Sequence, residues 1–371
     1  MLQKRFVQAS CFSGCFDLVV TYIDIFCFFV HHKAVYDIYL HNVDLFAIKH
    51  GVNMAVKIIG AGKALPVKKV LNSELPQELE TSDEWIRSHT GIGSRYICGE
   101  GENSATLGTK AALQALLAAQ AEGSSVKAED IDLIVCSTAT AKNWSFPSNA
   151  CLIQRGVGAS KAAVFDLSAA CSGFIYSLQV GRSMLNQMNW KYALIVGSEM
   201  LSKIVNWSDR GSCILFGDGA GAVVLERTDS GNDAFGSFVL GADGNGADVL
   251  YLDPDDLKLR MDGHAVYNFA VGKMVEIIQT VMEKDKLTID DVDLFVCHQA
   301  NERIIRAAAK RLNYPMEKFP VLLEEYANTS SASIPISLVD LAERGILKHG
   351  MKILLAGFGA GLTWGGCSLT W

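Results

Sequence analysis

An internal repeat constrains the fold of this chain more than any other feature of its sequence. Three segments recur about 160 residues further along, in the same order. The pairs are 130–136 with 291–297, 168–178 with 328–338, and 191–197 with 351–357. Short strands resemble one another by chance, but three matches at one offset favour a duplication. Because strand-like and helix-like segments alternate in each copy, we predict an α/β fold of two similar halves, 54–226 and 227–371, with a site between them.

The first 53 residues do not share this pattern. They hold four of the eight histidines and seven of the 17 phenylalanines, and they contain no proline. Their most apolar run, residues 18–30, is interrupted by Asp24 and is too short to span a bilayer. No clear signal-peptide cleavage site follows it. We expect the fold to begin at Met54, and residues 1–53 to be a divergent targeting leader, a disordered extension or upstream sequence wrongly joined to the gene.

The composition narrows the functional classes. The formal net charge of −7 argues against a nucleic-acid partner, which usually needs a basic face. The ten cysteines are scattered without any C-x-x-C pair, so no metal site and no dithiol redox motif are predicted. Scattered cysteines are typical of a reducing compartment. We therefore expect a cytoplasmic protein, or a plastid protein if residues 1–53 are a genuine targeting segment.

Cys171 is the strongest candidate for a reactive group. It lies between a predicted strand, 164–167, and a predicted helix that begins at Gly173. A thiol at this junction would face the unpaired N–H groups of the first helical turn, where the helix dipole favours a thiolate. Such placement lowers the pKa of a cysteine and makes it nucleophilic. The alternative is a small buried cysteine without a chemical role.

A cysteine nucleophile needs a proton partner and an oxyanion stabiliser, and the second half of the chain can supply both. His298 directly follows the predicted strand 294–297, at the carboxyl end where open α/β sheets place ligands. Asn328, which precedes a Ser/Thr run, can donate an amide N–H to an oxyanion without adding charge. The glycine run 357–361 permits close backbone approach. The structural alternatives are a core histidine, a turn or cap asparagine, and a plain turn.

Four motifs, taken together and in order, resemble the thiolase-fold condensing enzymes. They are A-A-C-S-G-F around Cys171, C-H-Q-A-N-E-R-I-I around His298, E-Y-A-N-T-S-S-A-S-I-P around Asn328, and G-F-G-A-G-L-T-W-G at 357–365. The sequence is most similar to the initiating β-ketoacyl-acyl-carrier-protein synthase III family, over essentially all of 54–371. This resemblance implies a duplicated thiolase-like fold with a five-layered αβαβα core, and a homodimer.

The resemblance also implies a two-stage reaction that starts fatty-acid synthesis. Cys171 would take an acyl group from a short acyl-CoA, with acetyl-CoA expected, and release CoA. His298 and Asn328 would then stabilise the enolate that forms when a malonyl-acyl-carrier protein loses carbon dioxide. The thioester oxyanion would be held by the N–H of Cys171 and one from the run Gly359, Ala360 and Gly361. CoA would act as a substrate, and no resident cofactor is expected.

Further positions follow the CoA tunnel of the family. The resemblance implies CoA contacts at Trp85, Arg210 and Asn301, an acyl pocket closed by Leu362 and by Phe146 across a dimer interface, and acyl-carrier-protein docking at Arg303. Two positions depart from the family pattern: His89 stands where arginine is frequent, and Asn268 stands where lysine is frequent. These two positions bear on the affinity for CoA and for the carrier protein.

Three other functions are kept as alternatives. A polyketide-type ketosynthase would share the fold and the same catalytic residues. A hydrolase with a Cys-His-Asn site would release free acid from an acyl-CoA and ignore malonyl donors. A non-enzymatic protein that binds the carrier would keep its activity after alkylation of Cys171. Elongating condensing enzymes usually carry two histidines, so Asn328 argues against that class.

Overall fold

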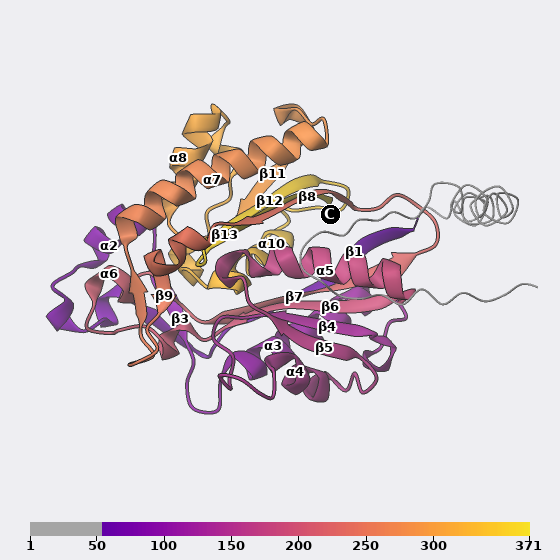
Figure 1. Cartoon of the computed structure of the whole chain (residues 1–371), viewed down its shortest axis with the longest axis horizontal. Coiled ribbons are helices and arrows are strands. Elements are labelled where there is room, and N and C mark those ends of the chain that lie inside the picture. The colour runs from indigo at the N-terminus through magenta and orange to yellow at the C-terminus, as the bar shows by residue number, and fades with distance from the viewer. Residues whose placement is uncertain (1–53) are drawn as a thin grey trace, which may run out of the picture. The chain divides into compact units, whose positions relative to one another are not determined.

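The computed structural model describes residues 54–371, so the prediction about residues 1–53 lies outside the described residues. Figure 1 shows two β-sheets and the helices that pack against them. No helix of the described part is long and apolar enough to cross a membrane. Within the described residues, the first element is strand β1, which begins at Ala55.

The first sheet has five strands in the order β1-β7-β6-β4-β5. Their bounds are β1 Ala55–Ala64, β7 Gly219–Thr228, β6 Tyr192–Glu199, β4 Leu133–Ser137 and β5 Ala163–Leu167. Strand β4 runs parallel to both β5 and β6, with Leu133 opposite Ala163 and Ala193. Strand β7 is antiparallel to β6 and to β1. Every residue of β4 and β6 is buried, as expected for strands covered on both faces.

The second sheet has four strands in the order β11-β12-β13-β8. Their bounds are β11 Leu294–Cys297, β12 Lys352–Gly359, β13 Thr363–Thr370 and β8 Phe235–Ala242. The first pair is parallel and the next two pairs are antiparallel. The series β4-β6-β7-β1 of the first sheet has the same strand directions. The two sheets are therefore copies of one arrangement, as the repeat predicted.

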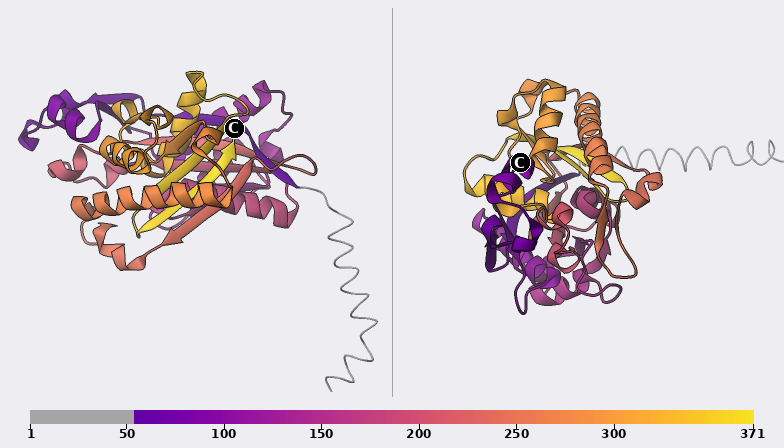
Figure 2. Two further views of the ribbon diagram at one scale, coloured as in Figure 1. Left: turned by 90° about the horizontal axis from the view of Figure 1, so that it is seen from above. Right: turned by 90° about the vertical axis from the view of Figure 1, so that its left-hand side faces the viewer.

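Helices form three layers around the two sheets (Figure 1). The middle layer is α5, Gly173–Met188, and α10, Ser333–Glu343, which contact strands of both sheets. The outer face of the first sheet carries α3, Ser104–Ala121, and α4, Asn149–Val157. The second sheet carries α7, Gly263–Lys284, and α8, Glu302–Leu312; Figure 2 shows α7 lying across its strands. This confirms the predicted five-layered α/β fold.

The remaining elements surround one end of this core. They are α2 Asp83–Thr90, α6 Arg210–Cys213, α9 Leu323–Tyr326, β2 Lys68–Leu71, β3 Ser94–Ile97, β9 Leu250–Leu252 and β10 Leu259–Met261. Helix α2 begins after Ser82, whose hydroxyl caps it by accepting a hydrogen bond from Trp85 N at 3.1 Å. Two single-turn 3₁₀ helices precede the middle-layer helices: η4, Ala170–Ser172, before α5, and η9, Ser330–Ala332, before α10.

Candidate active site

A cavity of about 660 Å³ brings the three predicted catalytic residues together. Cys171, His298 and Asn328 all line it, although they lie far apart in the sequence. They come from the start of the middle layer, from the end of β11 and from the segment after α9. No group of three or more His, Cys, Asp or Glu able to hold a metal ion occurs among residues 54–371. The cavity is the candidate active site.

Cys171 lies in η4, directly before α5, so the predicted strand-to-helix junction is confirmed. The residue is only 8% exposed, and its Sγ lies 3.3 Å from Ser330 Oγ. Burial raises the pKa of Cys171 to about 12, and the Ser330 hydrogen bond opposes this only in part. The predicted lowering of this pKa is therefore wrong for the free protein. Desolvation disfavours the thiolate more than the first turn of α5 favours it.

His298 directly follows β11, as predicted, and is almost completely buried. Its backbone N–H donates to Ala356 O at 2.8 Å, which fixes the residue to the neighbouring strand β12. Its ring Nδ1 lies 2.6 Å from Ser333 Oγ, and its ring meets Phe358 edge-on at 5.4 Å. Burial lowers the pKa of His298 to about 3, so the imidazole is neutral at ordinary pH.

Asn328 is held on its backbone and on its side chain. It pairs with Phe216 in a parallel bridge, donates from its backbone N–H to Leu215 O at 2.9 Å, and accepts at its carbonyl from Gly217 N at 3.0 Å. Its side-chain Oδ1 accepts a hydrogen bond from Ser330 N at 2.8 Å. Among residues 54–371, the Nδ2 group has no such partner. The amide is thus oriented with its donor group as the part left for a ligand in the cavity.

One segment, residues 328–333, contacts all three candidate catalytic groups. Asn328 belongs to it, the Ser330 hydroxyl contacts Cys171 Sγ, and the Ser333 hydroxyl contacts His298 Nδ1. The sequence showed this stretch only as a Ser/Thr run, and the separate roles of its serines were not predicted. The only signal in the sequence was the internal repeat, which aligns this run with the Cys171 region and so predicts an equivalent position in the second half.

Of the three residues Gly359, Ala360 and Gly361 that were predicted to form the oxyanion site, only Gly359 lines the cavity. Gly359 ends β12, lines the cavity and packs so close to η4 that a Cβ there would lie 2.6 Å from Cys171 N. Only glycine lets the two main chains approach in this way. Ala360 and Gly361 lie in the turn between β12 and β13 and are not among the residues that line the cavity.

The predicted CoA residues lie at the outer part of the same cavity. The Arg210 guanidinium lies 5.3 Å from the centre of the Trp85 ring, and the Trp85 and His89 rings stack at 4.1 Å. Asn301 caps the start of α8 and donates from Nδ2 to His89 O at 3.2 Å. The structure thus brings Trp85, Arg210 and Asn301 together around His89, the position that departs from the family pattern.

The remaining predicted residues fall on different surfaces. Leu362 lines the cavity, and Arg303 lines its mouth, with its guanidinium donating to Ser88 O at 3.2 Å. Asn268 is exposed on α7. Phe146 is 84% exposed and does not line the cavity of its own chain. Its predicted role across a dimer interface stays a prediction.

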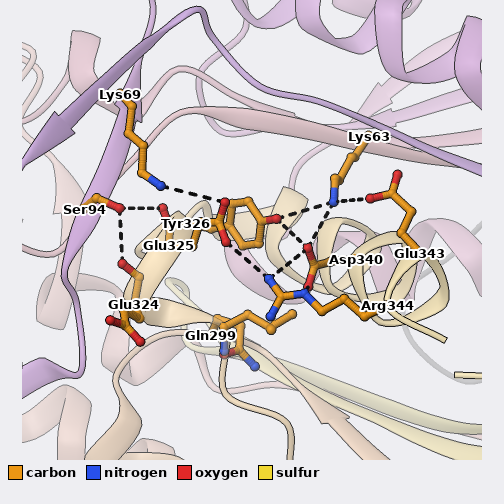
Figure 3. A network of polar contacts seen from close by, with 11 residues as sticks. Lys63, Lys69, Ser94, Gln299, Glu324, Glu325, Tyr326, Asp340, Glu343 and Arg344 are labelled. Carbon is orange, nitrogen blue, oxygen red and sulfur yellow. Dashed lines mark hydrogen bonds and ion pairs between the residues drawn. The ribbon is translucent and has the colours of Figure 1, made fainter. Parts of the chain in front are cut away.

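A polar network holds the segment that leads to Asn328 (Figure 3). The hydroxyl of Tyr326, the last residue of α9, donates to Asp340 Oδ1 on α10 at 2.5 Å. Lys63 of β1 pairs with Asp340 at 3.1 Å, and Arg344 pairs with it from the other side at 2.7 Å. Burial opposes the charge on Lys63, but its hydrogen bonds to Glu343 and Asp340 outweigh burial and raise the pKa of Lys63, so this lysine stays charged. It fixes α9 two residues before Asn328.

Comparison with known proteins assigns this chain to a family. Residues 165–244 match the family described as 3-oxoacyl-[acyl-carrier-protein (ACP)] synthase III, and residues 282–371 match its C-terminal family. A β-ketoacyl-[acyl-carrier-protein] synthase III from Clostridium acetobutylicum is 44% identical over 330 residues, which cover 85% of this chain and 99% of the relative. The chain belongs to the β-ketoacyl-[acyl-carrier-protein] synthase III family. It is therefore an acyltransferase of the thiolase-fold condensing enzymes.

One more relative and two solved structures agree with this assignment. The relative from Bacillus pumilus is 45% identical, with 86% of this chain and 99% of the relative covered. The crystal structure of the Aquifex aeolicus 3-oxoacyl-[acyl-carrier-protein] synthase III matches with a TM-score of 0.80 and 41% identity, over 85% of this chain and all of that one. A priming β-ketosynthase from a polyketide biosynthetic pathway matches with a TM-score of 0.79 and 34% identity, over 85% and 96%.

Proposed function

We propose that this synthase III initiates fatty-acid synthesis by condensing a short acyl-CoA with a malonyl-acyl-carrier protein. The products are a 3-ketoacyl-acyl-carrier protein, CoA and carbon dioxide. One observation carries the proposal: a buried thiol, a neutral imidazole and an oriented carboxamide converge on a single cavity. A decarboxylative condensation needs these three groups and no strong base.

The first stage is acyl transfer to Cys171. The thiol sulfur attacks the thioester carbonyl of the acyl-CoA, the bond from that carbonyl to the CoA sulfur breaks, and the thiol proton leaves with CoA. The negative charge that develops on the carbonyl oxygen is held by backbone N–H groups. Cys171 N and the backbone of Gly359 approach each other closely enough to form that oxyanion site.

The second stage is decarboxylation of the malonyl group and attack on the acyl-Cys171 thioester. The enolate oxygen that forms needs uncharged donors. We assign the proton of the Ser333 hydroxyl to the contact with His298 Nδ1, which leaves the ring proton on Nε2; the serine oxygen also accepts from Gln299 N at 3.3 Å. His298 Nε2–H and Asn328 Nδ2–H then stabilise the enolate, and its carbon attacks the thioester and releases Cys171.

The partner of His298 argues against the hydrolase alternative. A cysteine hydrolase needs its histidine as a base, which a nearby carboxylate would favour by stabilising the imidazolium. Here Nδ1 faces a serine hydroxyl, and burial lowers the pKa of His298 to about 3. Such a ring donates a hydrogen bond well but holds a proton poorly. The priming polyketide ketosynthase stays the second candidate, because that structure shares the fold at 34% identity.

The assignment of substrates and partners to residues combines the family resemblance with the lining of the cavity. We assign the CoA end to Trp85, Arg210 and Asn301, the acyl end to Leu362, and docking of the carrier protein to Arg303 at the mouth. CoA enters as a substrate thioester, and no resident cofactor takes part. The exposed Phe146 is assigned to a homodimer interface, where it would close the partner's acyl pocket. Seven free cysteines among residues 54–371 favour a reducing, cytoplasmic compartment.

The test is product analysis with acetyl-CoA and malonyl-acyl-carrier protein. Equal amounts of CoA, carbon dioxide and acetoacetyl-carrier protein are expected. Release of acetate at the same rate with and without the malonyl donor would overturn the proposal in favour of a hydrolase. Turnover only with acyl-CoAs and carrier proteins of a polyketide pathway would favour the second candidate.

A further inference from the structure

Glu199, the last residue of β6, is a buried carboxyl group without a cation. It is completely inaccessible to solvent, and no Lys, Arg or His of the described range forms an ion pair with it. The buried Asp340 differs, because Lys63 and Arg344 pair with it. Burying an unpaired carboxylate is costly, whereas the neutral acid is buried readily when it is hydrogen-bonded.

The two contacts of Ser331 are each satisfied by a separate proton when Glu199 is a neutral acid. Ser331 Oγ lies 2.8 Å from Glu199 Oε1 and 2.9 Å from the carbonyl oxygen of Ser137. A hydroxyl has one proton, and a carbonyl oxygen and a carboxylate oxygen are both acceptors. If Glu199 carries a proton on Oε1, it donates to Ser331, and Ser331 donates to Ser137. Both contacts are then satisfied.

The other oxygen of Glu199 has only donors around it. Thr140 Oγ1 lies 2.5 Å from Oε2 and itself accepts from Met200 N at 2.8 Å, so the hydroxyl proton of Thr140 points to Glu199. The Ala139 N–H lies between the two oxygens, 3.1 Å from Oε2 and 3.2 Å from Oε1, and a protonated oxygen keeps the capacity to accept. The two oxygens differ in their hydroxyl partners: Oε2 accepts from Thr140, and Oε1 faces Ser331, which can take its proton.

Asp218 shows the opposite arrangement. It too is completely buried, but both of its oxygens face donors: Ser202 N at 2.8 Å, Ser202 Oγ at 2.6 Å and Cys98 N at 2.8 Å. No partner in this set has to accept a proton from the carboxyl group. The contrast is in the hydrogen-bond partners: the neighbours of Glu199 can take up a proton, and those of Asp218 do not need one.

We propose that Glu199 is a positioning residue of the condensation site, held as a neutral acid whose proton fastens Ser331, and with it residues 328–333, to the end of β4. This segment orients Asn328 and supplies the hydroxyl groups that contact Cys171 and His298. Glu199 and Ser137 belong to the first half of the chain and the segment to the second. The inference rests on the proposed roles of the three catalytic residues.

The titratable groups that face Glu199 are two thiols. Cys136 lies on β4 and Cys171 in η4, and burial raises the pKa of both, that of Cys171 to about 12. Neither thiol changes charge between about pH 5 and pH 8. Burial also raises the pKa of Glu199. A change in stability that is specific to Glu199 in this range therefore reports its own carboxyl group.

The first test compares the pH dependence of unfolding in the native protein and in Glu199→Gln. Glutamine donates to Ser331 and accepts from Thr140 without titrating. An acid whose pKa is raised by folding stabilises the folded state below its unfolded pKa, and this contribution is lost as pH rises toward the folded pKa. We expect the unfolding equilibrium constant of the native protein to rise, relative to Glu199→Gln, about tenfold per pH unit above about pH 5. A ratio that stays constant between pH 6 and pH 8 would overturn the proposal.

The second test detects the acid directly. Infrared difference spectra of native protein and Glu199→Gln at neutral pH should contain the C=O stretching band of one protonated carboxylic acid, which the variant lacks. A carboxylate band in its place would contradict the proposal. Neither this test nor the pH test depends on catalysis, so each holds its meaning even if the proposed reaction is wrong.

The third test links the contact to the site. Ser331→Ala removes the group that receives the proton, and both acyl loading and condensation should fall by about 100-fold, because sub-ångström placement of reacting groups is lost. Glu199→Ala should show the same loss, and Glu199→Gln should restore most of it. The matched control is Ser177→Ala, which removes a buried hydroxyl on α5 that has no partner in the described range. Equal losses in Ser331→Ala and Ser177→Ala, or no rescue by glutamine, would reduce Glu199 to a general structural role.

Discussion

Ser333 Oγ lies 2.6 Å from Nδ1 of His298, and this contact decides what the histidine can do. The serine oxygen also accepts from Gln299 N, and in the proposed tautomer its proton goes to Nδ1 and the ring proton stays on Nε2. The Nε2–H donor of His298 therefore faces the cavity. A carboxylate at the same position would favour the imidazolium and convert the histidine into a base.

Replacing Ser333 with alanine should therefore damage the second stage alone. Without the hydroxyl, the tautomer and the orientation of His298 are no longer set, and we expect condensation to slow by about 10- to 100-fold. The rate of acyl transfer from acyl-CoA to Cys171 should change by less than about threefold, because Ser333 acts through His298 and not on the thiol. Stopped-flow acyl loading and steady-state condensation, measured on the same preparation, separate the two. Equal loss in both would show that Ser333 acts on folding.

Substitution of the three catalytic residues should divide the two half-reactions. Cys171→Ala removes the nucleophile, so acyl loading should be lost while malonyl decarboxylation continues. His298→Ala and Asn328→Ala each remove one enolate donor, and decarboxylation should fall by about 100-fold or more while loading persists. Radiolabelled acetyl transfer and carbon dioxide release measure the two stages. Loss of both stages in all three variants would contradict the assigned roles.

The thiol of the free protein should behave as an ordinary protonated cysteine. Because burial raises the pKa of Cys171 to about 12, the thiolate fraction grows with every step in pH. The rate of alkylation of Cys171 by iodoacetamide should rise about tenfold per pH unit between about pH 6 and pH 9, without a plateau. Peptide mass spectrometry isolates this residue from the other cysteines. A plateau of the alkylation rate below pH 8 would show that Cys171 has the low pKa that the sequence predicted.

Gly359 should tolerate no side chain. Gly359→Ala would place a Cβ 2.6 Å from Cys171 N and push β12 away from η4. We expect a loss of about 1–3 kcal/mol in the free energy of unfolding, together with slower acyl loading. Gly272→Ala on α7 is the control, because a Cβ there meets nothing within 4 Å and helix propensity favours alanine. Native stability and native acyl loading in Gly359→Ala would show that Gly359 does not belong to the oxyanion site.

The repeat and the motifs predicted a large part of this architecture. Periodic apolar segments and a constant offset depend only on local sequence, so the two related sheets and the junction at Cys171 could be inferred. The convergence of Cys171, His298 and Asn328 also followed, because the ends of parallel strands and the starts of their helices meet at one edge of a sheet.

Burial and side-chain partners could not be read in the same way. The pKa of Cys171 was predicted in the wrong direction, because it depends on how tightly the second half covers η4. The roles of Ser330 and Ser333 depend on which hydroxyl group points to which neighbour. The contact between Glu199 and Ser331 joins residues 132 positions apart, and no local pattern announces it.

The measurement that tests the central claim most directly is mass spectrometry of the protein and its peptides after incubation with acetyl-CoA, followed by malonyl-acyl-carrier protein. We predict one acetyl group on the peptide that contains Cys171, stable until the malonyl donor is added and then lost as acetoacetyl-carrier protein forms. An acetyl group on another residue, or an adduct that decays to acetate without the malonyl donor, would contradict the account.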